Sequence, residues 1–130
     1  MKSIVIYSSL TGNTKQVAEA ITSVLPAGTP CVSMKEVPSD LSSYDLVFAG
    51  FWVDKGTANK EARDVLGTLH NPYIALFATA GVPPQMAHAK ESLINAANCL
   101  PDGVEPVGTF ICQGKVDPKV IEMMYKMFRK

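Results

Sequence analysis

The sequence predicts an α/β fold, a three-layer sandwich in which one parallel sheet is covered by helices on both faces. Five apolar runs alternate along the chain with segments of helical periodicity, which is the pattern of a doubly wound sheet. The apolar runs are continuous, as expected of strands that are buried on both faces. All 130 residues, 47% of them hydrophobic and 18% charged, fit one domain spanning 1–130.

The first elements are a buried strand at residues 2–8 and a helix at about 13–25 with one apolar face. Pro26-Ala27-Gly28 ends this helix. A short strand at 31–34 follows, which we place at an edge of the sheet. The connection at 38–44 has room for one helical turn.

The rest of the chain continues the alternation. It predicts, in order, a buried strand at 45–50, a loop at 51–56, a helix at 57–69, a strand at 73–79, a helix at 84–99, a strand at 107–112 and a last helix from 117.

The loop after the first strand, Ser8-Ser9-Leu10-Thr11-Gly12-Asn13-Thr14, has the chemistry of an anion site. Five of its seven residues carry a hydroxyl or amide side chain, and Gly12 lets a ligand approach the backbone. The free N–H groups of the following helix point at this loop, and the helix dipole favours an anion there. We predict a phosphate-binding loop, against the alternative of a polar turn that only caps the helix.

Composition and missing motifs narrow the function. Twelve basic and twelve acidic residues give no net charge, which argues against a nucleic-acid binder. The phosphate loop lacks the Gly-Lys-Ser/Thr ending of a Walker loop and the G-x-G-x-x-G dinucleotide fingerprint. The three cysteines have no metal-ligand spacing and predict reduced thiols in a cytoplasmic protein. The N-terminal apolar run is too short for a signal peptide or a membrane span.

Three loops leave the carboxyl ends of predicted strands: 8–14, 51–56 and 79–84. Ligands of doubly wound sheets bind at these ends, where the strand order switches direction. We therefore expect the three loops to converge on one binding site. No residue set has the pattern of a catalytic triad, a metal site or a carboxylate pair, so a bound cofactor would carry any chemistry.

Ser9-Leu10-Thr11-Gly12-Asn13-Thr14 matches the phosphate-loop pattern T/S-x-T-G-x-T of the flavodoxins, and the chain resembles a short-chain flavodoxin along nearly its whole length. The segment 112–115 is also similar to the flavodoxin-like accessory proteins that support bacterial bilirubin reduction. The resemblance implies a sheet of order 2-1-3-4-5 with FMN at the switch point. Trp52 is the expected stacking residue, with Phe51 as the alternative. The cofactor-binding residues that it implies are Ser9, Leu10, Thr11, Gly12, Asn13, Thr14, Phe51, Trp52, Val53, Asp54, Thr79, Ala80, Gly81 and Val82.

The resemblance implies an FMN-binding electron-transfer protein that serves a partner enzyme. We also expect a monomer that binds neither nucleic acid nor a membrane. Two alternatives stay open at this point. One is an FMN-dependent NAD(P)H reductase of a small acceptor. The other is a flavin-bearing accessory subunit of a larger reductase. We expect an electron carrier or accessory protein rather than a self-sufficient enzyme.

Overall fold

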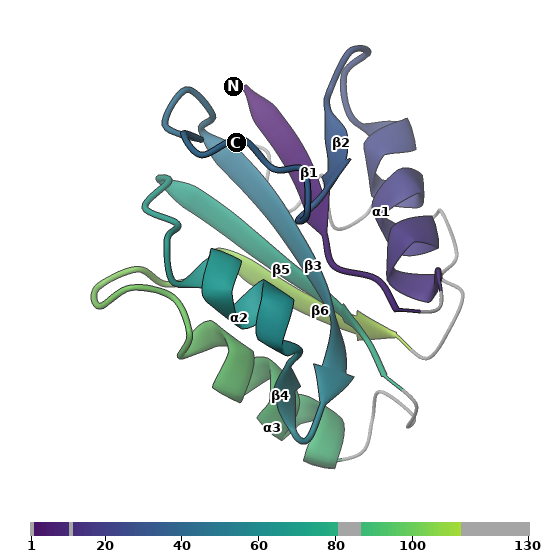
Figure 1. Cartoon of the computed structure of the whole chain (residues 1–130), viewed down its shortest axis with the longest axis vertical. Helices are drawn as coiled ribbons and strands as arrows, with labels where there is room; N and C mark the ends of the chain where they lie inside the picture. Colours follow the sequence, from purple (N-terminus) through teal and green to yellow (C-terminus); the bar gives the residue numbers. More distant parts are fainter. Residues whose placement is uncertain (1, 11, 81–86, 113–130) are drawn as a thin grey trace.

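The computed structural model describes residues 2–10, 12–80 and 87–112, which form a sheet flanked by helices (Figure 1). The strands are β1 Ser3–Tyr7, β2 Cys31–Ser33, β3 Leu46–Asp54, β4 Thr57–Ala58, β5 Tyr73–Thr79 and β6 Gly108–Cys112. The helices are α1 Asn13–Val24, α2 Lys60–Leu66 and α3 Ala87–Ala97.

The sheet has the strand order β2-β1-β3-β5-β6, and each neighbouring pair in this path is parallel. With the short strand β4 set aside, this is the predicted order 2-1-3-4-5, with β2 at an edge as expected. The chain leaves β1 in one direction, to β2, and then crosses back to β3. The strand order therefore switches at β1 and β3, and this is where the site is expected.

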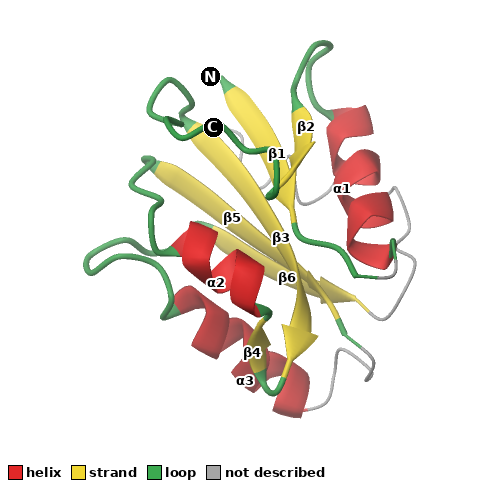
Figure 2. Ribbon diagram, in the orientation of Figure 1, coloured by secondary structure: helices red, strands yellow, loops and turns green. Residues whose placement is uncertain are grey.

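Helices cover both faces of the sheet and give three layers (Figure 2). The core on one side joins Val17, Ala18 and Ile21 of α1 to inward residues of the strands. The core on the other side joins Ala62 of α2 and Ala96 of α3 to the opposite face. The predicted fold class is confirmed.

The prediction for 51–69 was wrong in its local structure. β3 does not end at residue 50 but continues to Asp54, and β4 pairs with it as an antiparallel hairpin. Lys55 and Gly56 form the turn with φ of 53° and 81°, the left-handed region that two-residue hairpins require. The helix then begins only at Lys60. A strand of two residues has no periodicity of its own, so the buried Ala58 fits the apolar face of a helix equally well in the sequence.

The connection between β2 and β3 contains turns and bends but no helix. The helix predicted at 84–99 is present as α3, whose described part is Ala87–Ala97. The expected last helix from 117, the segment 113–115 and positions 84–86 lie outside the described residues.

Candidate functional site

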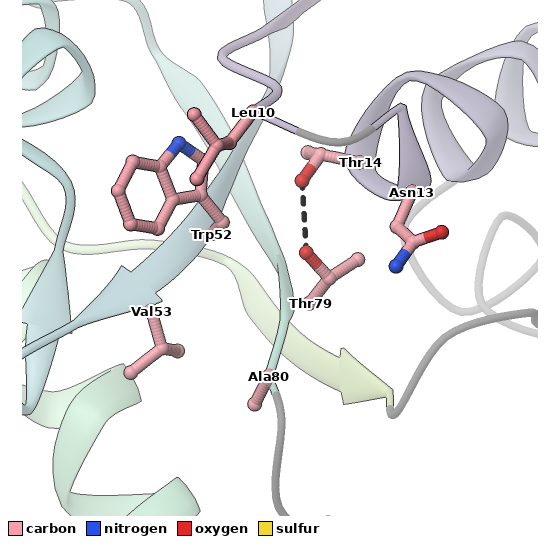
Figure 3. Close-up of a pocket in the computed structure, with 7 residues that line it drawn as sticks. All are labelled: Leu10, Asn13, Thr14, Trp52, Val53, Thr79 and Ala80. Carbon is pink, nitrogen blue, oxygen red and sulfur yellow. Dashed lines mark hydrogen bonds between the residues drawn. The ribbon is translucent and has the colours of Figure 1, made fainter.

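A pocket lies at the carboxyl ends of β1, β3 and β5, where the strand order switches (Figure 3). Its lining comes from three separate parts of the chain. The lining residues are Leu10, Asn13, Thr14, Trp52, Val53, Thr79 and Ala80. Described residues from each of the three predicted segments therefore line one pocket, although the second segment is a hairpin instead of a loop and positions 81–84 of the third lie outside the described residues.

Size does not distinguish this pocket, which holds about 240 Å³. A hollow of about 260 Å³ lies at the opposite end of the sheet, and one of about 370 Å³ lies beside 97–106. The position at the switch point and the chemistry of the lining single out the first pocket.

The beginning of α1 fits an anion. Gly12, the residue before the helix, has a φ of 95°, and a Cβ placed there would meet open space. Ser9 Oγ accepts the N–H of Gly12 at 3.1 Å and that of Lys15 at 3.3 Å, which braces the loop while leaving the hydroxyl hydrogen of Ser9 to donate elsewhere. The first turn of α1 carries no acidic residue, so no side-chain charge there opposes an anion at this positive helix end.

Two buried hydroxyls connect the helix to the end of β5. Thr14 Oγ1 and Thr79 Oγ1 lie 2.8 Å apart, and the bond is drawn as a dashed line in Figure 3. The pair holds two hydroxyl hydrogens and its mutual bond uses one. One O–H is therefore left to donate to a group in the pocket.

Trp52 supplies the aromatic part of the pocket. It is half-buried near the end of β3 and pairs in register with Thr79 of β5. Phe51, its neighbour in the strand, points to the other face and is fully buried in the core of α2 and α3. This geometry favours Trp52 over Phe51 as the stacking surface.

Most predicted site residues in the described segments meet at this pocket. Ser9 and Gly12 shape the loop at its edge, whereas Phe51 and Asp54 are not part of the lining. Thr11, Gly81 and Val82 lie outside the described residues.

Sequence reasoning missed a polar network directly behind the pocket. Ser8 is hydrogen-bonded to both Asn59 and Glu61, and Asn59 also accepts a bond from the backbone N–H of Trp52. An Asn just before a helix with a Glu in its first turn is a recognisable helix start. The sequence offers no signal that these side chains would instead reach Ser8, 51 residues away from Asn59.

Neither a metal cluster nor a membrane-spanning helix occurs in the part of the chain that the structure describes. No group of three or more His, Cys, Asp or Glu side chains there is placed to hold a metal ion. None of the described helices has the length and apolar character needed to cross a bilayer.

The fold and the pocket together define a doubly wound α/β domain with a pocket at the switch point of its parallel sheet. The family model described as "Flavodoxin domain" matches residues 4–130. The chain belongs to the flavodoxin domain family.

Two curated relatives share substantial sequence with the chain. Both are called flavodoxin-like domain-containing protein BilS. The one from Clostridioides difficile is 40% identical over 119 residues, which cover 89% of this chain and 68% of the relative. The one from Clostridium symbiosum is 38% identical over 144 residues, covering 98% and 75%.

Solved structures of low identity share the fold. A flavoprotein from Bacteroides uniformis has a TM-score of 0.72 at 17% identity, covering 96% of this chain and 97% of its own. A flavoprotein from Lactobacillus acidophilus, solved in complex with FMN, has a TM-score of 0.65 at 19% identity, covering 85% and 92%.

Proposed function

We propose that this chain binds FMN in the pocket at the ends of β1, β3 and β5, and that it carries electrons for a partner enzyme. The observation that supports this best is the meeting of a helix N-terminus, an aromatic side chain and two hydroxyls in one pocket. Membership of the flavodoxin domain family supports the choice of FMN among nucleotides.

The phosphate of FMN is assigned to the loop before α1. Ser9 Oγ takes the N–H of Lys15, and the N–H groups of Asn13 and Thr14 at the start of α1, with the close approach allowed by Gly12, suit a dianion. The hydroxyl of Ser9 and the free O–H of the Thr14–Thr79 pair add donors from the side chains. Each charge-assisted bond of this kind contributes about 1.5–3 kcal/mol.

The ring of FMN is assigned to the space beside Trp52, whose half-buried indole offers a flat apolar surface. Val53 and the small Ala80 line the same space. When bound, the isoalloxazine supplies reversible uptake of one or two electrons, which the side chains of this pocket do not provide themselves. The protein holds and orients the ring and limits its contact with water.

A role as the flavin-bearing subunit of a larger reductase is supported by the surface at the pocket. Leu10 lines the pocket and is 70% exposed, and the chain has no net charge with which to steer a charged partner. This combination suits a partner that docks by apolar contact. We place the chain in the cytoplasm, where its thiols stay reduced, and expect it to be a monomer when no partner is bound.

Titration of the purified apoprotein with FMN tests the cofactor assignment. We expect one FMN per chain, with quenched flavin fluorescence, and at least about tenfold weaker binding of riboflavin because it lacks the phosphate. Failure to retain FMN would reject the proposal. Equal affinities for FMN and riboflavin would reject the phosphate assignment alone.

The same holoprotein separates the carrier from the reductase. NAD(P)H added with a quinone is expected to be oxidised only when a separate reductase is present. Rapid oxidation by the holoprotein alone would favour the FMN-dependent reductase. Association with a partner that persists at high salt would favour the accessory subunit, since apolar docking is weakly screened.

A further inference from the structure

Three polar side chains behind the pocket form one chain of hydrogen bonds that begins at Trp52. The backbone N–H of Trp52 donates to Asn59 Oδ1 at 3.3 Å, and Asn59 Nδ2 donates to Ser8 Oγ at 2.7 Å. Ser8 Oγ in turn donates to Glu61 Oε1 at 2.6 Å. Every donor points toward the Glu61 carboxylate, so the bonds polarise and strengthen one another.

Asn59 is used in an unusual way. It is the residue before α2, and its carbonyl accepts the N–H of Arg63 at 2.9 Å, which starts the helix. Asparagine at this position normally turns its side chain onto the helix backbone, but Asn59 makes no such capping bond. Its side chain goes to Trp52 and Ser8 instead. The side chain of Asn59 therefore contacts the hairpin and does not cap α2.

The contact of Asn59 with Trp52 has two parts. Besides the side-chain bond, the backbone N–H of Asn59 donates to the carbonyl of Trp52 at 3.1 Å. Both backbone polar groups of Trp52 on this side are therefore held by one residue. This extends the pairing of β3 with β4 by one position beyond Val53 and Ala58.

Ser8 connects this hairpin to the phosphate loop. It is buried directly after β1, its backbone N–H donates to the carbonyl of Gly50 at 3.0 Å, and it is the first residue of the loop at 8–14. Because its hydroxyl hydrogen is directed to Glu61, Ser8 does not offer that hydrogen to a ligand. Its hydroxyl joins the root of the loop to the base of the hairpin and to the first turn of α2.

The tip of the hairpin has a second attachment. Asn95 of α3 donates from Nδ2 to the carbonyl of Gly56 at 2.7 Å. The segment that carries Trp52 is thus held at its base by Asn59 and at its tip by Asn95.

We propose that Ser8, Asn59 and Glu61 are positioning residues that fix Trp52 relative to the phosphate loop, and so set how tightly the proposed site holds a flavin ring. The predicted effect on flavin binding rests on the proposed function. The placement of Trp52 does not, because every bond in the chain forms within the protein.

The first experiment uses the apoprotein and needs no ligand. Trp52 is the single tryptophan, so intrinsic fluorescence reports on this position alone. Asn59→Ala is expected to shift the Trp52 emission to the red and to increase its quenching by acrylamide. Asn71→Ala is the matched control, since it also removes a buried amide with two hydrogen bonds, but at the opposite end of the sheet. Identical emission from both variants and the wild type would overturn the proposal.

The second experiment measures the Kd for FMN. Ser8→Ala and Asn59→Ala are expected to raise it about 10-fold, and Asn71→Ala to leave it unchanged. Glu61→Ala is expected to weaken FMN, whereas Glu61→Gln keeps an acceptor oxygen for Ser8 and should restore most of the affinity. If Asn59→Ala does not fold, the two Glu61 variants decide the question.

The outcomes separate this proposal from the assignment of FMN. If the wild type binds no FMN, the proposed function fails, and the emission of Trp52 alone still tests the positioning role. If the wild type binds FMN and all variants match it, the positioning role fails and the cofactor assignment stands.

Discussion

The two ends of the sheet each bury one asparagine amide, and they use it differently. At the end away from the pocket, Asn71 is 9% exposed, and its Nδ2 donates to the carbonyls of Leu41 and Tyr44 at 2.9 and 2.8 Å. These bonds close the connection that leads into β3. At the pocket end, Asn59 is 4% exposed and bonds to Trp52 and Ser8.

The difference lies in what stands beyond each amide. Asn71 donates only to backbone carbonyls of the fold, so a substitution there should change the free energy of unfolding and not ligand binding. Asn59 bonds to the backbone of Trp52, whose half-buried indole lines the pocket. A substitution at Asn59 should therefore change the affinity for a ligand in the pocket. Similar buried chemistry thus serves the fold at one end of the sheet and the site at the other. Substitutions at the two ends should separate stability from binding.

Gly50→Ala is expected to have the largest effect. Gly50 lies opposite Phe77 in the sheet, and a Cβ at position 50 would overlap the Phe77 ring. Relieving this overlap in a packed core costs about 1–3 kcal/mol or more, and it would displace β3 just before Trp52. Urea unfolding of the apoprotein measures the loss.

Gly67→Ala is the control at the far end of the sheet. A Cβ there would meet Arg63 O at 3.6 Å, an ordinary contact, and the φ of Gly67 is −65°. We expect unchanged or slightly increased stability, by about 0.4–1 kcal/mol. Equal losses at Gly50 and Gly67 would contradict the packing described for Phe77.

Thr14→Val should follow in size and act mainly on binding. Valine keeps the shape of Thr14 but removes the bond to Thr79 and one donor at the phosphate loop. FMN affinity is expected to fall by about 1.5–3 kcal/mol, or about 10- to 150-fold in Kd, and riboflavin affinity by much less. Isothermal titration with both ligands measures the difference.

Thr68→Val provides the comparison from the far end. Thr68 Oγ1 donates to the carbonyl of Val65 on the exposed surface, and no ligand contact is expected there. Its FMN affinity should equal that of the wild type. If Thr14→Val lowered the affinities for FMN and riboflavin to the same extent, the assignment of the phosphate to this loop would be wrong.

Leu10→Ala tests a smaller, apolar contribution. Because Leu10 is 70% exposed, its truncation should change the free energy of unfolding by less than about 0.5 kcal/mol. A ligand in the pocket would cover part of Leu10, so FMN affinity should fall about 2- to 5-fold, in line with partial burial of one aliphatic side chain. Ile94→Ala, 61% exposed on α3, should change neither quantity. The same loss of affinity in both variants would assign the effect to general surface hydrophobicity.

The sheet could be predicted from the sequence because strands that are buried on both faces consist of continuous apolar runs. Phe48 and Leu76 are buried in such runs and indicate β3 and β5 directly. The position of the loop at 8–14 was also predictable, since it lies between an apolar run and a helical pattern, which the structure has as β1 and α1.

The hairpin and the network were not predictable, for two physical reasons. β4 is too short to carry a period, and its turn uses Lys55 in a left-handed conformation that the sequence does not announce. Asn59 and Glu61 look like an ordinary helix start, and only the packing of β1 against the hairpin brings Ser8 to them. Local patterns predict elements, whereas bonds between distant side chains depend on how the elements meet.

The smallest effect is expected at Cys31, which lies between the two ends, on the edge strand opposite Val5. Burial raises the pKa of the Cys31 thiol, an effect that the hydrogen bond with Thr22 partly offsets. A raised pKa leaves less thiolate at a given pH, so alkylation of folded Cys31 should reach half its maximum rate at higher pH than in the urea-unfolded chain. Unfolding lowers this pKa, so the thiol favours the folded state at neutral pH and loses that contribution as the pH rises through the folded value.

Iodoacetamide labelling read by peptide mass spectrometry gives the profile for Cys31 separately from the other cysteines. FMN should leave the profile nearly unchanged, because none of the residues that shift the pKa of Cys31 lines the pocket. A shift on adding FMN would mean that binding reaches the edge of the sheet, and that the separation between the two ends is incomplete.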